Sequence, residues 1–373
     1  MNLLKRLPID GFVVSILATV GIASLLPARG AAVPVTDWTT TLLIGALFFL
    51  YGARLSFTET MHGLRSWRLQ ASVVSVTFLV FPLIGIVLLF TLNQVLPPAL
   101  LGGLVFVCLL PSTVQSSIAF TSIAGGNVPG AVVAASLSNT LGVVVTPLLA
   151  VLVLGGAGTT STAGGITFDG SSAVSIVLQL LLPYIAGQIA HRWLAGWLAK
   201  HRSVLKIVER GSILVVVYSA FSEAMRENVW AALPPLSIVL TGVLCIVILA
   251  IVLGVSTLLG RVLGLERADR IVLLFCGSKK SLAAGLPMAG VLFGAAGLGM
   301  AIVPLMLFHQ IQLIVCAVLA GRMGRRTAAA AAEAAAEAAR QLAPPATDLT
   351  TAIPVQRGVT GGGSRDGVVA PTE

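Results

Sequence analysis

Charge is what this sequence has least of. Only 10% of its 373 residues are Asp, Glu, Lys or Arg, whereas a soluble globular domain carries about 25%. The run from Leu69 to Phe168 contains 100 residues without one of these four types. A soluble fold cannot absorb such a run, because part of it would have to cover the surface. We therefore predict an all-α polytopic membrane protein.

The usual signals of enzymes are also missing. The sequence has no CxxC pair, no HExxH motif and no Walker-type glycine loop, so it offers no metal or nucleotide site. We predict that the chain is not an enzyme and holds no metal. Its cysteines all lie in apolar segments, where small buried thiols are expected instead of disulfides; they are Cys108, Cys245, Cys276 and Cys316.

Ten apolar segments are predicted to cross the bilayer, each near the roughly 20 residues that a spanning helix needs. The first could instead be a signal peptide, since Lys5 and Arg6 precede it, but its uncharged run is longer than a usual signal core. The seventh is the weakest, because Glu209 and Glu223 leave a short uncharged part. The segments are 11–28, 38–56, 70–92, 98–125, 129–154, 172–191, 206–225, 231–260, 269–294 and 297–321.

The basic residues test this topology. With the N-terminus inside, sixteen Lys and Arg residues fall in cytoplasmic segments, and only Arg29 and Arg226 fall outside. The positive-inside rule demands this bias. We predict a multi-pass plasma-membrane protein with both termini in the cytoplasm. The net charge is +9. Because the basic residues lie in short loops between apolar segments, we predict that the partner is the lipid bilayer and not nucleic acid.

Ten spans divide into two sets of five, and an odd-numbered repeat forces the second copy to be inverted. We predict a first inverted repeat at 1–154 and a second at 155–323. Each half places a polar, breakable helix fourth, at Pro111–Ala119 and Gly277–Ala283. Residues 324–373 are predicted to be a disordered cytoplasmic tail, although the alanine-rich part at 327–340 has a helix-forming composition.

The first breakable segment follows Pro111, which cannot donate a backbone hydrogen bond and opens the helix. Five polar side chains follow it, and they could coordinate a cation or a polar substrate. The alternative is that the hydroxyl groups bond back to their own helix. The five are Ser112, Thr113, Gln115, Ser116 and Ser117. Pro82, Pro147 and Pro183 are predicted to be ordinary kinks.

The second breakable segment carries adjacent lysines, Lys279 and Lys280, flanked by Ser278 and Ser281. Lys279 lies about 12 Å along a helix from Ile271, near mid-bilayer. Charged residues at this depth usually face a protein interior or a cavity. Because neighbouring side chains on a helix diverge, one lysine is expected to face the site and the other to snorkel or pair elsewhere.

The predicted spans contain no carboxylate at the depth of the lysines. Such ammonium groups must be deprotonated, hydrated, held by carbonyls, or paired with an anion that arrives, and the last option predicts a small organic anion as substrate. In other spans, the sequence leaves two interpretations open for Asn139 and Gln310, which are site lining and interhelical hydrogen-bond partners. For His309 it leaves open a hydrogen-bonded structural residue or a proton relay.

Ten spans with Ser117-Ile118-Ala119 running to Gly126-Asn127-Val128, and with Gly-Ser-Lys-Lys-Ser-Leu at 277–282, resemble the bile acid:sodium symporter superfamily. The likeness is strongest to its orphan, symporter-like branch. Phe81-Pro82 and His309-Gln310 fit as well. The resemblance implies a panel domain of spans 1, 2, 6 and 7 and a core domain of the other six, in which unwound helices four and nine cross at the site.

By position, the resemblance matches Ser116 and Ser117 to a sodium-ligand pair and Ser278 to a ligand glutamine. It puts Leu274 where sodium-coupled members have a glutamate, and Ala131 and Ala135 at the ligand positions of helix five. Losing the anionic ligand should weaken a sodium site severely. We hypothesise that one lysine replaces a sodium ion, so that sodium coupling is doubtful and a proton is the other candidate coupling ion.

The sequence thus predicts a secondary active transporter, symporter-like, that moves an organic anion by alternating access. A sterol-like acid, a small carboxylate and a sulfate conjugate all remain open as substrates. Two other functions remain open: a membrane regulator or scaffold that does not transport, and a passive channel. The sequence does not determine the oligomeric state.

Overall fold

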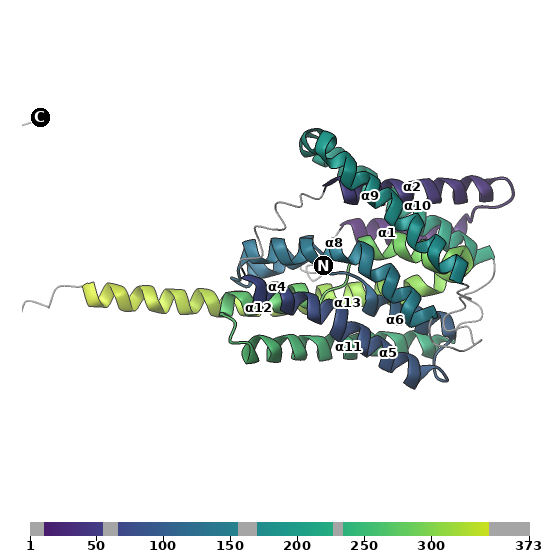
Figure 1. Ribbon diagram of the computed structural model, residues 1–373. Helices are drawn as coiled ribbons and strands as arrows, with labels where there is room; N and C mark the ends of the chain where they lie inside the picture. Colours follow the sequence, from purple (N-terminus) through teal and green to yellow (C-terminus); the bar gives the residue numbers. More distant parts are fainter. Residues whose placement is uncertain (1–10, 55–65, 156–169, 227–233, 343–373) are drawn as a thin grey trace, which may run out of the picture. The chain divides into compact units, whose positions relative to one another are not determined.

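The computed structural model describes residues 11–54, 66–155, 170–226 and 234–342 (Figure 1). Every regular element in these ranges is a helix, so the predicted all-α class is confirmed for them. The elements are α1 (Gly11–Leu25), α2 (Ala32–Arg54), α4 (Trp67–Ser75), the π-helix η3 (Val76–Val80), α5 (Phe81–Leu92), α6 (Pro98–Leu109), α7 (Gln115–Ile123), α8 (Val128–Ala150), the π-helix η4 (Val151–Gly155), α9 (Gly170–Lys200), α10 (Arg202–Arg226), α11 (Pro235–Val262), α12 (Arg267–Gly277) and α13 (Leu282–Leu342).

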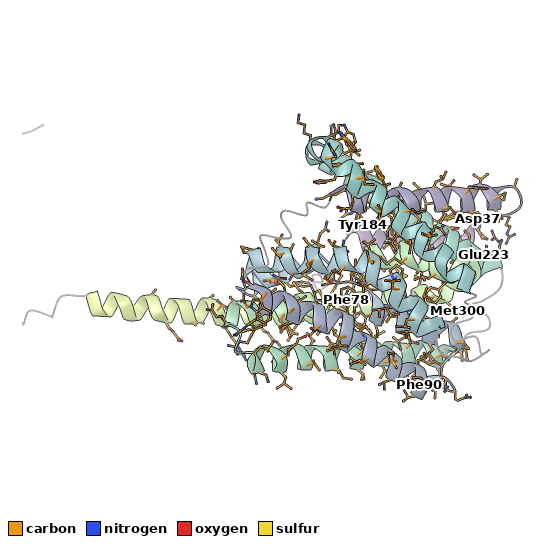
Figure 2. All side chains as sticks on the ribbon, viewed as in Figure 1. Asp37, Phe78, Phe90, Tyr184, Glu223 and Met300 are labelled. Atoms are coloured by element: carbon orange, nitrogen blue, oxygen red, sulfur yellow. The ribbon has the colours of Figure 1, made fainter. Side chains whose placement is uncertain are left out.

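Six helical segments are long and apolar enough to cross a membrane, and two shorter ones, Val14–Leu25 and Pro98–Leu109, are apolar as well. Outward-facing side chains such as Phe90, which is 71% exposed, give these helices an apolar outer surface (Figure 2). A bilayer requires such a surface. The six are Ala32–Ala53, Trp67–Leu92, Val128–Gly155, Pro235–Val262, Arg267–Phe293 and Leu298–Ala330. The arrangement of ten spans in inverted repeats stays a prediction.

The chain reverses direction within α13. A Cβ atom on Gly285 would lie 3.0 Å from a methyl group of Leu305, yet a straight helix would separate these residues by about 30 Å. Gln312 likewise returns to contact Lys280. The first part of α13 therefore pairs with α12 as one crossing of the bundle, and the part from Leu298 forms the next. This agrees with the separate ninth and tenth spans of the prediction.

Four helices form one packing group within residues 1–327. α2 lies beside α9 and α1 beside α10, and α10 also contacts α2 (Figure 1). Gly52 and Gly187 permit the close approach of α2 and α9, because a Cβ atom on either would collide with a carbonyl oxygen of the other helix. These helices correspond to spans 1, 2, 6 and 7, which the resemblance groups together.

The second packing group holds the interrupted helices. α12 contacts α4, α7, α8 and α11, and α6 contacts α5, α8 and α11. The core of this group is fully buried around Phe81, Phe106 and Phe308. Two of its aromatic pairs, Phe81 with Phe308 and Phe106 with Phe293, meet edge to face, which is a favoured geometry.

The chain divides into two compact units, 1–327 and 328–373. In the second unit, helix continues to Leu342. Residues 324–342 are thus helical, although the sequence analysis predicted a disordered tail from residue 324. Their high alanine content favours a helix and explains the difference. Residues 343–373, like Lys5, Arg6 and Arg65 of the predicted cytoplasmic charge, lie outside the described residues.

Candidate functional site at a junction of two interrupted helices

Helix α6 stops where the sequence predicts a break. It ends at Leu109, Leu110 adopts an extended conformation with ψ of 155°, and α7 begins at Gln115. Pro111 causes the break because it has no N–H to continue the hydrogen-bond ladder. The hydroxyl group of Thr146, on α8, donates to the carbonyl of Leu109 at 2.8 Å and so satisfies one of the freed groups.

The second interruption lies between helix α12, which ends at Gly277, and helix α13, which begins at Leu282. Ser281 restarts the helix, because its hydroxyl oxygen accepts the backbone N–H of Ala284 at 3.1 Å as an N-cap. The backbone N–H of Ser281 donates to the carbonyl of Pro111 at 2.9 Å. This bond joins the two interruptions, residues 110–114 and 278–281, and we call the place where they meet the junction.

Two of the four hydroxyl groups after Pro111 bond across to α12. Ser112 Oγ donates to the carbonyl of Cys276 at 2.5 Å, and Ser117 Oγ donates to that of Phe275 at 3.2 Å. Thr113 Oγ1 lies 2.7 Å from Ser116 Oγ and 3.1 Å from Ser117 Oγ. Ser278, in the second interruption, bonds back to its own helix, because its hydroxyl donates to the carbonyl of Leu274.

Lys280 fills the centre of the junction. Its side chain is fully buried, and its ammonium group donates to three backbone carbonyls, those of Thr77 at 3.0 Å, Cys108 at 3.0 Å and Leu110 at 2.6 Å. The nitrogen also lies 3.9 Å from the centroid of the Phe81 ring. We call the three carbonyls the carbonyl cage. Carbonyl capture is one of the outcomes that the sequence left open for this charge.

Two prolines make the carbonyl cage available. In the π-helix η3, the N–H of Phe81 bonds to the carbonyl of Val76, and Pro82 has no N–H, so the carbonyl of Thr77 keeps no backbone donor. The carbonyl of Cys108 would accept from Ser112 in a continuous helix, but that N–H donates to Ser138 Oγ at 3.1 Å instead.

Pro82 is therefore more than the ordinary kink that the sequence predicted. It withholds the donor that would otherwise compete with Lys280 for Thr77. Pro147 and Pro183 lie inside the helices α8 and α9, as expected of kinks.

Lys279 is buried as deeply but bonded differently. Its side chain has no exposed surface, and its ammonium group finds no hydrogen-bond partner among the described residues. It lies instead 3.7 Å from the centroid of the Phe120 ring and 5.7 Å from that of Phe275. An ammonium group over an aromatic face is attracted by the ring quadrupole.

No carboxylate touches either lysine among the residues that the structure describes. Glu223 pairs with Arg226 on α10, and Asp269 accepts a hydrogen bond from Asn127 at 2.8 Å near the start of α12. Both acids are thus engaged elsewhere. Within the described ranges, the positive charge of the junction has no fixed negative partner.

Gln312 is the residue at the junction that the sequence analysis missed. Its amide oxygen accepts the N–H of Lys280 at 2.8 Å, and its amide nitrogen donates to the carbonyl of the same lysine at 2.8 Å. That nitrogen also lies 3.0 Å from His309 Nδ1. The amide replaces the helical partners that the interruption removed.

Helical periodicity could have identified Gln312. Buried positions in this part of α13 recur every three or four residues, and Gln312 falls on that face while Gln310 is only half-buried. The buried positions with this spacing are Ala301, Leu305, Phe308, Gln312, Cys316 and Ala320. The same pattern on α8 places Ser138 at the junction and leaves Asn139 half-buried beside it. Gln115 is exposed at the start of α7.

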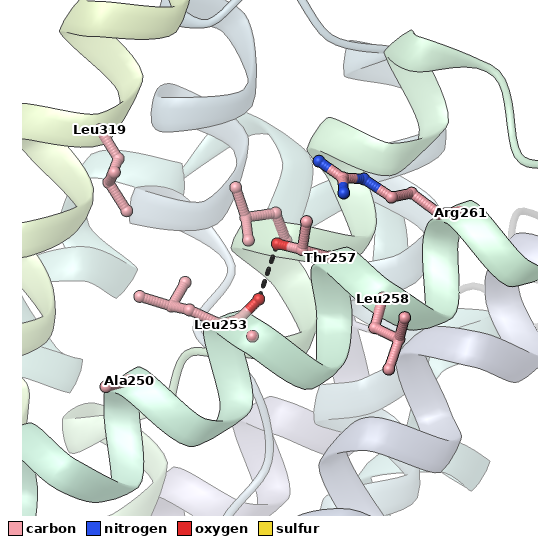
Figure 3. A pocket seen from close by; sticks show the side chains of 8 residues that line it. Ala250, Leu253, Thr257, Leu258, Arg261 and Leu319 are labelled. Carbon is pink, nitrogen blue, oxygen red and sulfur yellow. Dashed lines mark hydrogen bonds between the residues drawn. The ribbon is translucent and has the colours of Figure 1, made fainter.

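An open groove of about 470 Å³ lies along α11 (Figure 3). Leu253, Thr257, Leu274 and Leu319 line it, with Arg261 at one end, and the Thr257 hydroxyl is bonded to the Leu253 carbonyl. None of the predicted binding residues lines this groove. Leu274, in the wall of this groove, is the position where the resemblance expects a sodium-binding glutamate. This chain has an apolar side chain there.

Comparison with known proteins identifies the family of the chain. Residues 10–325 match the SBF-like CPA transporter family (DUF4137). The chain belongs to this family. The match covers all the interrupted helices, and it confirms the resemblance to bile acid:sodium symporter-type proteins that the sequence indicated. The family is one of transporters, in agreement with the prediction that the chain is a membrane transporter and not an enzyme.

Three relatives illustrate the range of the family. The uncharacterized protein PA2026 of Pseudomonas aeruginosa is 49% identical over 317 residues, which cover 85% of this chain and 93% of that protein. "Putative symporter YfeH" of Escherichia coli K12 is 43% identical over 319 residues, covering 86% and 94%. "Sodium/bile acid cotransporter 7" of Xenopus tropicalis is 29% identical over 329 residues, covering 86% and 93%.

Proposed function

We propose that this transporter is secondary active and carries an organic anion across the plasma membrane by alternating access. The observation that carries the proposal is the junction itself: two interrupted helices bonded through Ser281 and Pro111, with two lysines buried beside the bond. Helix breaks around ionisable groups at membrane depth are the common construction of a transporter site.

The charge balance favours an anion as the substrate. A buried ammonium group is costly unless it is paired, and neither lysine meets a carboxylate among the described residues. An incoming anion would supply the missing charge. The apolar side chains next to the ammonium of Lys279, chiefly Phe120 and Phe275, suit the hydrocarbon part of an organic anion better than a bare inorganic ion.

Burial of the lysines favours alternating access over a passive channel. Neither side chain has any exposed surface, so a substrate can reach them only after the helices around the junction rearrange. A channel would need a continuous path past the same groups. The two packing groups of helices are the natural bodies to move against each other, as the resemblance implies.

We further propose that the ammonium of Lys280 replaces a coupling sodium ion. Three carbonyl oxygens hold it at 2.6 to 3.0 Å, an arrangement of hard oxygen ligands around a positive charge. Leu274 also removes the anionic ligand that the resemblance expects in a sodium site. Transport is then independent of sodium, and a proton is the remaining candidate for coupling.

Uptake into proteoliposomes tests the proposal. The full chain is purified and screened by thermal shift against sterol acids, small carboxylates and aryl sulfates, and the anions that stabilise it are radiolabelled. We expect uptake above that of protein-free vesicles when choline replaces sodium, and a response to an imposed pH gradient. Strict sodium dependence without a pH response would refute the sodium replacement. Current without coupled solute would indicate a channel, and binding without uptake a regulator.

A further inference from the structure

We infer that the two adjacent lysines divide the work of the site: Lys280 is a fixed structural cation, and Lys279 is the residue that binds the transported anion. This inference rests on the proposed function and names the binding residue within the site. It follows from the way in which each ammonium group uses its donors.

Lys280 has no donor left for a substrate. An ammonium group carries three N–H donors, and Thr77, Cys108 and Leu110 each accept one. These acceptors are backbone atoms of two different spans, held in place by the breaks at Pro82 and Pro111. Gln312 fixes the backbone of the same lysine from a third direction. An anion could recruit Lys280 only by dismantling the junction.

Lys279 has all three donors unused among the described residues. Its ammonium is stabilised by the ring of Phe120 at 3.7 Å, and such a contact contributes less than the charge-assisted hydrogen bonds that a carboxylate or sulfonate accepts. A bound anion therefore displaces the aromatic contact at a net gain. The ring holds the charge while the site is empty of substrate.

The surroundings of Lys279 also define the class of anion. Phe120 and Phe275 belong to a buried apolar cluster that continues through Leu313, Cys316 and Ala320 on α13. A ligand that places its anionic group on Lys279 would lay its remaining part against this cluster. The geometry thus points to an amphipathic organic anion with an aromatic or alicyclic body.

The ring of Phe120 is the closing element of this site. Phe120 lies on α7, a helix of nine residues between the interruption and the turn at Gly125. Its side chain is 7% exposed, and its ring covers one side of the Lys279 ammonium at 3.7 Å. A shift of α7 uncovers Lys279 without breaking the carbonyl cage, because no carbonyl of the cage belongs to α7.

The experiment compares Lys279→Met with Lys280→Arg in the purified full chain. The probes are benzoate, naphthalene sulfonate and cholate, with acetate as the small-anion control, and the readouts are thermal shift and proteoliposome uptake. We expect Lys279→Met to fold with a midpoint close to wild type and to weaken the response to the amphipathic probes at least tenfold. We expect Lys280→Arg to lower the midpoint without anion but to keep a ligand-induced shift.

A second variant keeps the inference testable if Lys279→Met does not fold. Phe120→Leu removes the aromatic face that holds the ammonium of Lys279 but keeps an apolar side chain. Acetate has no hydrocarbon body to contact residue 120, so it isolates the competition for the ammonium and should bind several-fold more tightly to this variant than to wild type. Retention of full binding of the amphipathic probes by Lys279→Met, or weaker binding of acetate by Phe120→Leu, overturns the assignment. If wild type transports a probe and Lys279→Met transports it equally, only this inference fails. If no probe binds or moves with wild type, the proposed function fails with it.

Discussion

Replacing Lys280 by methionine measures what the carbonyl cage contributes to the fold. Methionine keeps an unbranched apolar side chain of similar length but has no donor. Three buried carbonyls, those of Thr77, Cys108 and Leu110, would lose their partner, and each unsatisfied group costs about 1–3 kcal/mol. Removing the buried charge itself relieves desolvation and offsets part of this loss. The expected net loss is on the order of 3–5 kcal/mol, typical of removing one partner of a buried ionic contact.

Lys279→Met is the matched control, since it makes the same chemical change one position away. It removes a contact with the Phe120 ring, about 0.5–2 kcal/mol, together with a buried ammonium that has no hydrogen bond among the described residues. These effects oppose each other. The free energy of unfolding of this variant should therefore stay within roughly 1 kcal/mol of wild type, within the range of a favourable cation–π contact.

The assay is unfolding of both purified variants in the same detergent, followed by circular dichroism and by intrinsic fluorescence. For a protein of this size, the Lys280 variant should unfold on the order of 5 °C below wild type, and the Lys279 variant close to wild type. Equal losses for the two variants would refute the distinction between them. A stable Lys280→Met would show that the cage does not hold the junction together.

The remaining predictions concern the support of the junction and the packing of the helices. Gln312→Leu should destabilise the protein by about 1–3 kcal/mol, because the backbone of an interrupted segment loses both amide partners; Gln310→Leu, at a half-buried position, should change the unfolding midpoint little. Pro82→Ala returns a backbone N–H that competes for the Thr77 carbonyl, so it should lower the unfolding midpoint. Gly52→Ala should impair folding, measured by yield of monodisperse protein, because its Cβ meets the backbone of α9. Gly45→Ala, with open space around it, should be tolerated, and equal yields for the two would contradict the close packing of α2 and α9.

Some features of the site could be predicted from residue chemistry alone. Pro111 cannot continue a helix wherever it lies, so the break after Leu109 was predictable without knowing its neighbours. The two lysines could be placed at membrane depth because their distance along a helix from the start of the apolar segment follows from the number of residues between them. The family resemblance also rested on local sequence, around Gly277–Leu282, and the family match confirms it.

Other features depend on partners that are remote in sequence. Thr77 and Cys108 lie 203 and 172 positions from Lys280, and no pattern within one span shows that their carbonyls meet its ammonium. Pro82 looked like a kink because the effect of its missing N–H appears only where another helix supplies a donor. Gln310 and Asn139 were predicted instead of Gln312 and Ser138 because the helical phase of these positions was not considered.

The sequence by itself determined the membrane class, the apolar spans, the two breaks and the presence of an uncompensated positive pair, because each follows from the local cost of charge, of hydrogen bonding and of proline in a hydrophobic chain. Only the tertiary structure decided which ammonium group is hydrogen-bonded and which contacts aromatic rings alone. Lys279 and Lys280 are neighbours, so the local sequence around them is nearly the same. They differ in the atoms that folding places around their ammonium groups.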